Sequence, residues 1–391
     1  MPLSQGSLVM RVGPSSMAGA AARGGHTCAR ACAPSARAAH AHAQGEGRVV
    51  VREARVRVES DGWDTATVAG FAGRKVGSWS HLGALFPCAD GERVAAGSPG
   101  PMCLREGGEG EAGDVVLFWS PAEALDGAPA LRRMVAGEEA GWRDAWARFP
   151  GLARRLGLSD YARKLPVWAP GEAAARKERL KASEASRLVE EPAPLPGALS
   201  VAFGATRSGE DNVNLSTMLA DPEGREFCEH VLRPTLLAQG EALERVAPRR
   251  ARAMRDAVAQ SGRGVLGVPH FETVAISVNH ALRFHRDVHD LGDGLSCMLC
   301  LHGGAEAVHG GELVMPGLAA DERGGRGGCE TGGGATREAP LGAHVLPMPH
   351  GAVTMFQAHR LWHATMPVGM PAQDPDACRI QLISFCKEPK E

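Results

Sequence analysis

The sequence is short of aromatic residues, of net charge and of long apolar runs. Only 5% of its 391 residues are aromatic, a single tyrosine among them, and the formal net charge is −2. Near-neutrality argues against a highly charged nucleic-acid tail, although a local basic face stays open. No apolar stretch approaches the ~20 residues that a bilayer-spanning helix needs, so we expect a soluble protein without a membrane partner. The hydrophobic content of 44% supports a sizeable core and excludes a wholly disordered chain.

The N-terminal half divides by composition into two parts. The first 45 residues contain arginines but no acidic side chain, which is typical of an organelle transit peptide or of a disordered Ala-rich extension. We therefore predict a disordered or targeting leader over residues 1–46. The alternation in GRVVVREARVRV predicts a strand and EEAGWRDAWARF predicts a helix, so residues 47–199 are expected to mix both. Residues 222–262 are again predicted to be helical.

The C-terminal part, residues 200–391, carries the strand signals. After Gly262 the chain consists mostly of short β-branched or alternating segments separated by Gly, Pro or Asp turns. Such a succession indicates an antiparallel sandwich or jelly roll. Residues 320–340 are too rich in glycine to pack and are predicted to form a mobile surface insertion.

The ten cysteines do not predict disulfides or a zinc site, because most of them are scattered along the chain. Cys297 and Cys300 form the one CxxC pair, within the predicted strand LSCMLCL. Residues three apart on a strand point to opposite faces, so these two thiols are expected to be buried separately. The pattern favours structural thiols in a reducing compartment.

Two histidines, a carboxylate and an arginine form the constellation that can carry chemistry. His285 and Asp287 are two apart at a predicted strand end, so both side chains share one face. With a third ligand from a distant strand they would form a facial triad for Fe(II), which leaves positions open for a co-substrate and O₂. On their own, the two residues are more typical of a solvated strand end than of a metal site. His363 can supply the third ligand, and Arg379, flanked by apolar residues, can hold a carboxylate with its planar fork.

These segments resemble the TET/J-binding-protein dioxygenases. The resemblance covers roughly residues 210–388 and depends on HRDVHDLGDG and WHATMPVGMPAQDPDACRIQLISF. It implies an α+β fold with a double-stranded β-helix (jelly-roll) core flanked by helices. It also implies that His285, Asp287 and His363 bind Fe(II), that Arg379 holds the co-substrate carboxylate, and that the substrate is 5-methylcytosine in DNA. Because that DNA is the expected partner, we expect nuclear localisation, with a plastid as the alternative given by the leader.

Asp290 makes the resemblance more specific. Animal members of the family tend to carry an amide three residues after the metal-binding Asp, whereas the algal branch carries an acid, as this sequence does. The algal enzymes can use L-ascorbate in place of 2-oxoglutarate and transfer a glyceryl group to the 5-methyl carbon, releasing CO₂ and glyoxylate. The resemblance therefore implies ascorbate as co-substrate, with Asp290 binding it. Asp290 could instead cap the turn DLGDG.

Other interpretations of the same residues stay open. The co-substrate could be 2-oxoglutarate, with oxidation of 5-methylcytosine to 5-hydroxymethylcytosine. A prolyl-type protein hydroxylase also uses HxD and a distal His, but it usually anchors 2-oxoglutarate with Lys. The chain could also be an inactive relative that binds DNA, for which the arginines of residues 247–264 offer a basic helix face. His359 could replace His363 as the third ligand.

Overall fold

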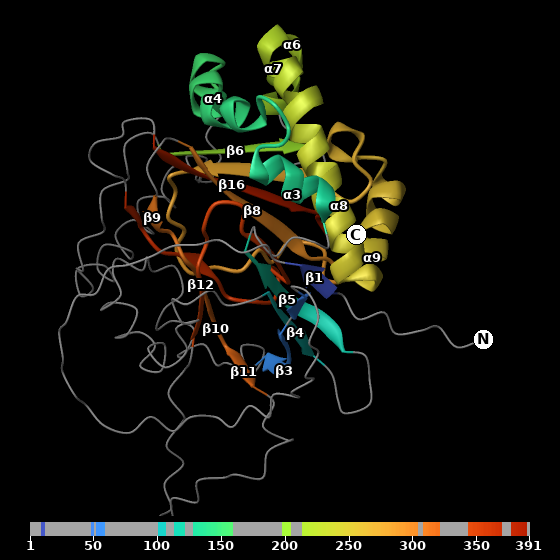
Figure 1. Ribbon diagram of the computed structural model, residues 1–391. Coiled ribbons are helices and arrows are strands. Elements are labelled where there is room, and N and C mark those ends of the chain that lie inside the picture. Colours follow the sequence, from blue (N-terminus) through green and yellow to red (C-terminus); the bar gives the residue numbers. More distant parts are fainter. Residues whose placement is uncertain are drawn as a thin grey trace, which may run out of the picture.

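The computed structural model describes the chain in separate ranges, shown as coloured ribbon in Figure 1. They are residues 9–11, 48–50, 52–58, 101–106, 113–121, 128–158, 198–204, 213–303, 308–320, 343–369 and 377–388. The strands are β1 (Val9–Arg11), β2 (Arg48–Val50), β3 (Arg52–Val58), β4 (Met102–Glu106), β5 (Asp114–Ser120), β6 (Leu199–Gly204), β7 (Thr273–Val278), β8 (Ser296–Gly303), β9 (His309–Gly310), β10 (Leu313–Pro316), β11 (Leu318–Ala320), β12 (Ala343–Leu346), β13 (Val353–Phe356), β14 (Ala364–Thr365), β15 (Val368–Gly369) and β16 (Cys378–Phe385). The helices are α3 (Pro129–Ala136), α4 (Trp142–Arg155), α6 (Val213–Ala220), α7 (Pro222–Phe227), η4 (Cys228–Leu232), α8 (Arg233–Val246), α9 (Pro248–Ser261) and the short η5 (Val265–Gly267).

The strands of the C-terminal part roll into two facing sheets. In the larger sheet the described strands follow the order β11-β3-β4-β5-β13-β8-β16-β7-β6, and in the smaller one β12-β10-β14. All neighbours in both sheets are antiparallel except the parallel pair β3–β4. From β8 onward the chain passes repeatedly between the sheets, with β8, β11, β13 and β16 in the larger and β10, β12 and β14 in the smaller, while β9 and β15 pair with each other. This alternation is the winding of a double-stranded β-helix, so the predicted α+β jelly-roll fold is confirmed.

The large sheet is buried on both faces because it has a layer on each side. On strand β8, Cys297 and Leu299 belong to one core cluster, and Met298 and Cys300 belong to the other. The first cluster also contains helix residues, and the second contains residues of the small sheet. A central strand buried on both faces is expected to be apolar throughout, as SCMLCL is.

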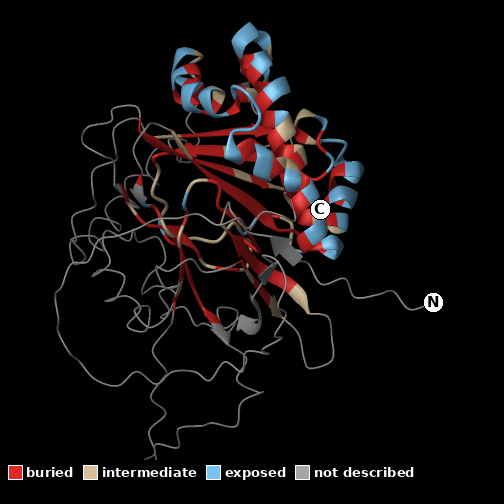
Figure 2. Ribbon diagram, in the orientation of Figure 1, coloured by how far each residue is buried: buried red, intermediate tan, exposed pale blue. Residues whose placement is uncertain are grey.

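The helices cover the face of the large sheet that lies away from the small sheet (Figure 1). Their inner sides are buried and their outer sides exposed (Figure 2). In α4, Trp142, Trp146 and Phe149 recur at helical spacing and are all buried. The Phe149 ring stacks on Phe227 of α7 with ring centroids 5.2 Å apart. The helix predicted over 222–262 is present as a series of helices, α7, η4, α8 and α9.

Several expectations concern residues outside the described ranges. They include most of the leader 1–46 and nearly all of the insertion 320–340. Within the 47–199 region, β3, β4 and β5 join the same sheet as the jelly-roll strands. The boundary at residue 200 stays a prediction.

The structure also bears on the cysteines and on membrane-spanning helices. Cys297 and Cys300 lie in different core clusters, as the spacing predicts. Both are buried and form no disulfide, and the same holds for the other cysteines of the described ranges, Cys103, Cys228, Cys378 and Cys386. Among the residues that the structure describes, no helix has the length and apolar character needed to span a bilayer.

Candidate metal centre

The two histidines of the predicted triad face each other across a single bridge between neighbouring chain segments. The backbone of His285 pairs antiparallel with that of His363, and the two residues exchange both N–H···O bonds at 3.0 Å. Side chains directly opposite in such a pair lie on the same side. Their ring centroids are accordingly 4.2 Å apart. The segment after β13 and the segment after β7 thus each bring one imidazole to the same place.

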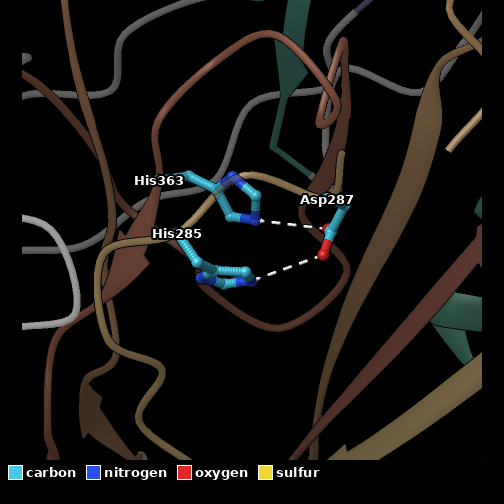
Figure 3. Close-up of side chains that lie close together, drawn as sticks. All are labelled: His285, Asp287 and His363. Atoms are coloured by element: carbon cyan, nitrogen blue, oxygen red, sulfur yellow. Dashed lines mark ion pairs between the residues drawn. The ribbon is translucent and has the colours of Figure 1, made fainter. Parts of the chain in front are cut away.

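Asp287 completes the group from the segment of His285. Its Oδ1 lies 3.6 Å from Nε2 of His285, and its Oδ2 lies 3.6 Å from Nε2 of His363 (Figure 3). One ligand atom from each of the three residues lies within 4.8 Å of the others. The Asp287 N–H donates to the Ala358 carbonyl at 2.9 Å, which fixes the backbone of the carboxylate against the segment that leads to His363. The structure therefore brings together the three residues that the sequence proposed as ligands.

Both imidazoles are oriented with Nε2 directed at the shared site. Nδ1 of His285 is 2.7 Å from the Arg283 carbonyl, and Nδ1 of His363 is 3.0 Å from the Leu361 carbonyl. A carbonyl accepts only from a protonated nitrogen, so these contacts place the proton on Nδ1 and leave the Nε2 lone pair for a metal. His363 is 3% exposed. Burial, and then the nearby His285, lower its pKa to about 4, so the ring is neutral at neutral pH.

The donor set suits one type of ion. Two neutral imidazoles and one carboxylate are the ligands of the facial triad found in non-haem Fe(II) oxygenases, with coordination positions left open. His285 and Asp287 are partly exposed, at 35% and 41% of their side chains, while His363 is buried. The site is therefore open to solvent on one side and closed on the other by Phe356, whose ring lies edge-on to His363 at 4.9 Å.

Arg379 lies at the start of β16 and is 1% exposed. Its Nη2 donates to the Gly311 carbonyl, and its backbone N–H donates to Asn279 Oδ1 at 2.8 Å. Its Nε and Nη1 are buried without a hydrogen-bond partner. Among the described residues, no carboxylate lies within ion-pair distance of this guanidinium. Burying a cation whose Nε and Nη1 make no hydrogen bond costs free energy. The arrangement therefore indicates an anionic ligand that accepts from these two groups.

Arg379 and the histidines face the same interior. Along β16, Arg379 is followed on the same face by Gln381, whose amide contacts Met298 Sδ at 3.2 Å. Met298 and Phe356 belong to the core cluster between the two sheets. Phe356 in turn packs on His363. The guanidinium and the triad therefore belong to one barrel interior.

Asp290 lies next to the triad, but its carboxyl group is already hydrogen-bonded within the protein. It is 8% exposed and accepts a hydrogen bond from the Ser296 hydroxyl at 2.9 Å. Burial, followed by the charge of Asp287, raises its pKa. The turn amide of Gly294 bonds to the Leu291 carbonyl and that of Gly292 to Glu388, so the Asp290 side chain does not cap the turn. A role in co-substrate binding stays a prediction.

The other candidate ligands lie elsewhere. His359 lines a small cavity together with Asp290, Ser296 and Cys386, apart from the three grouped ligands. Most arginines of the predicted basic face are engaged within the protein. Arg249 pairs with Asp114 at 2.6 Å and Arg255 with Glu244 at 2.5 Å. Arg250 is buried. The other four arginines of this stretch, Arg249, Arg252, Arg255 and Arg263, are exposed, so the stretch forms a largely solvated helix face. Two of these four are engaged in ion pairs, so an open phosphate-binding row fits poorly.

Sequence reasoning missed Gly311 and Asn279, the two residues that hold Arg379. Gly311 has φ +73°, and a Cβ there would lie 2.6 Å from the Arg379 guanidinium carbon. The GG pair in VHGGELVMP was the one available signal, because paired glycines mark backbone that other residues cannot adopt. Nothing in the local sequence connected this pair with Arg379.

Comparisons with known proteins find only solved structures of low similarity. No family model matches the chain, and no curated protein does. Similar solved structures include a 2OG-Fe(II) oxygenase family oxidoreductase from Burkholderia pseudomallei, with 18% identity, a TM-score of 0.24, and coverage of 63% of this chain and 91% of that one. A Pseudomonas putida prolyl-4-hydroxylase has 13% identity and a TM-score of 0.22, with 55% and 85% covered. The non-haem α-ketoglutarate-dependent epimerase SnoN of nogalamycin biosynthesis has 13% identity and a TM-score of 0.23, with 55% and 87% covered. At these values the comparisons carry no functional argument, and the jelly roll is established by the strand order described above.

Proposed function

We propose that this protein is an Fe(II)-dependent oxygenase that uses O₂ and a carboxylate-bearing co-substrate of the 2-oxoglutarate type. The observation that carries the proposal is the pairing, in one barrel interior, of a His-Asp-His group with a buried arginine that lacks an anion. Either feature alone has structural explanations. Together they supply a metal face and a carboxylate anchor, the two requirements for binding a 2-oxo acid.

Each residue has a definite part in this proposal. His285 and His363 would bind the metal through Nε2, with Nδ1 held by backbone carbonyls, and Asp287 would bind it through its carboxylate. Arg379 would bind the far carboxylate of the co-substrate through its free donors. Phe356 shields His363 and helps keep the inner side dry. When bound, ferrous iron supplies the redox chemistry that activates O₂, which protein side chains cannot provide.

Metal and co-substrate binding test the proposal directly. Wild-type protein should bind Co²⁺, an oxygen-stable substitute for Fe²⁺, with 1:1 stoichiometry, and His363→Ala should lose most of that affinity. In the presence of Fe²⁺ and O₂, wild-type protein should release CO₂ from 2-oxoglutarate, and Arg379→Ala should need far more co-substrate. An Arg379→Ala variant with unchanged affinity for 2-oxoglutarate would remove that residue from the site.

For the substrate, we propose 5-methylcytosine in DNA. The support is the resemblance of HRDVHDLGDG and WHATMPVGMPAQDPDACRIQLISF to TET/J-binding-protein dioxygenases. The metal group is open on the His285–Asp287 side, which is the side that a flipped-out base could reach. A prolyl-type protein hydroxylase remains the alternative enzyme and has no specific observation in its favour. An inactive DNA-binding relative is the non-enzymatic alternative.

The identity of the co-substrate, L-ascorbate or 2-oxoglutarate, is a separate part of the proposal. The resemblance of Asp290 to the algal branch favours L-ascorbate and glyceryl transfer, whereas the carboxylate-type site at Arg379 equally suits 2-oxoglutarate. Mass spectrometry of nucleosides, after methylated DNA is incubated with Fe²⁺ and either compound, distinguishes them. A glyceryl adduct with ascorbate alone supports the algal reaction, and 5-hydroxymethylcytosine with 2-oxoglutarate alone supports TET-like oxidation. Unchanged DNA together with a hydroxylated protein would contradict the DNA substrate.

The role of Asp290 has its own test. Asp290→Asn should selectively abolish the use of ascorbate if the carboxyl group binds that compound. If ascorbate use survives the substitution, Asp290 acts only through its bond to Ser296.

A further inference from the structure

Arg250 is a buried cation in the helical layer that covers the large sheet. It lies in α9, and its side chain is 7% exposed. Its Nε donates to the Val115 carbonyl of β5 at 3.0 Å. Asp114 and Asp293 lie at 3.7 and 4.0 Å, at the edge of ion-pair distance. The guanidinium therefore reaches from α9 to the beginning of β5, an internal strand of the large sheet.

The end of this guanidinium binds the amide of Gln357. In the orientation that satisfies both groups, the Gln357 side-chain oxygen accepts hydrogen bonds from Nη1 at 2.8 Å and from Nη2 at 2.6 Å. Gln357 is 3% exposed, so water does not compete for these bonds. Hydrogen bonds to a charged donor are stronger than neutral ones, particularly away from solvent. Gln357 is thus held firmly at the end of β13.

Gln357 begins the turn that carries the metal group. Its carbonyl accepts from the N–H groups of Arg360 and Leu361 at 3.0 and 2.8 Å. Within this turn, the Ala358 carbonyl accepts from the Asp287 N–H at 2.9 Å. The Leu361 carbonyl contacts Nδ1 of His363 at 3.0 Å. One short turn therefore fixes the backbone of one proposed ligand and the ring of another.

We propose that Arg250 is a positioning residue for the metal centre and acts through Gln357. Although Arg250 touches none of the three ligands, its forked bond fixes the first residue of the turn whose carbonyls orient Asp287 and His363. Lysine cannot replace it, because an ammonium group is a point donor and lacks the planar fork. The inference rests on the metal assignment of the proposed function.

The test is the affinity of the full-length protein for Co²⁺, measured by visible absorption. Because mutations of groups that orient metal ligands typically weaken binding 10- to 100-fold, we expect Arg250→Lys to raise the Kd for Co²⁺ by at least about tenfold. The matched control is Arg249→Lys, on the same helix, since Arg249 makes an exposed ion pair with Asp114. That variant should keep the wild-type Kd within about twofold.

A double-mutant cycle tests the route through Gln357. Gln357→Asn keeps the amide but shortens its reach, and it should raise the Kd as much as Arg250→Lys does. The double variant should be no weaker than either single variant, because both remove the same contact. If Arg250→Lys fails to fold, as judged by circular dichroism, the Kd of Gln357→Asn for Co²⁺ tests the proposal alone.

The possible failures are distinguishable. A wild-type protein that binds no Co²⁺ would overturn the proposed function. A wild-type protein that binds Co²⁺ while both variants bind it equally well would overturn only the role of Arg250. If the increases in Kd caused by Arg250→Lys and Gln357→Asn multiply in the double variant, the two residues do not act through the same contact.

Discussion

At the residue scale, Gly311 determines where the Arg379 guanidinium can lie. A Cβ at this position would approach the guanidinium carbon and Nη1 to 2.6 Å. We expect Gly311→Ala to displace Arg379 and to raise the KM for the co-substrate at least about tenfold, as the loss of a charge-assisted contact would. Binding of Co²⁺ should stay within about twofold, because Gly311 touches none of the ligands.

Gly262 supplies the matched control for this prediction. Its φ of +66° is close to the +73° of Gly311, but a Cβ there would meet nothing within 4 Å. Both substitutions therefore impose backbone strain of about 1–2 kcal/mol. Only Gly311→Ala should affect the KM. Equal KM values in the two variants would show that Gly311 matters for backbone conformation alone.

Arg379 should also make the fold sensitive to its ligand. Because two of its donors are unmade in the free protein, an anion that satisfies them stabilises the native state. Together with Co²⁺, 2-oxoglutarate at about 100 times its Kd should add about 2.7 kcal/mol to the free energy of unfolding and raise the Tm. Arg379→Leu should abolish the Tm increase caused by 2-oxoglutarate and keep the one caused by Co²⁺. An equal rise in both proteins would place the co-substrate elsewhere.

Residues differ in how far the sequence alone predicts them. The two-residue period of a predicted strand pointed to His285 and Asp287, but β7 ends at Val278 and His285 forms only an isolated bridge with His363, so the pair was found through a strand that the structure does not contain. The burial of Arg379 follows from its apolar neighbours. The meeting of His363 with His285 required the family resemblance, because nothing local specifies which distant strand pairs with which. The contacts of Gly311 and Gln357 are tertiary, so no pattern along the chain indicates them.

At the element scale, α4 is attached to the sheet by its aromatic side. Phe149 is fully buried among Trp146, Phe203 and Phe227. Removing such a ring leaves a cavity, so Phe149→Ala should lower the free energy of unfolding by about 3–5 kcal/mol in urea denaturation. Arg148→Ala, on the exposed side of the same helix, should change it by less than about 0.5 kcal/mol. Similar losses in both variants would mean that α4 is held by helix propensity instead of packing.

The types of the individual helices and strands were easier to predict from the sequence than the order in which the strands pair. The helical period around Trp142 and the alternation in β3 gave the right element types. The parallel pairing of β3 with β4, and the union of β3–β5 with the jelly-roll sheet, depend on contacts between distant residues. Strand order of that kind is not encoded in any short window.

At the scale of the whole molecule, the buried cysteines should be chemically inert. Burial raises the pKa of the Cys228 thiol to about 12 and raises those of Cys297, Cys300 and Cys386 as well. A thiol reacts as its thiolate, so these residues should resist alkylation by iodoacetamide at pH 8 in the native protein and react in urea. Peptide mass spectrometry reads each position separately. Rapid native labelling of Cys297 would show that the sheet opens readily at β8.

The bridge between His285 and His363 has a consequence for how the protein matures. The two residues are far apart in the sequence and meet only when the smaller sheet has received its last segments. Contacts between distant residues form late, because chain entropy must be lost before they contribute. A nascent or partly collapsed chain would therefore hold metal poorly, and iron loading would report that the barrel has closed.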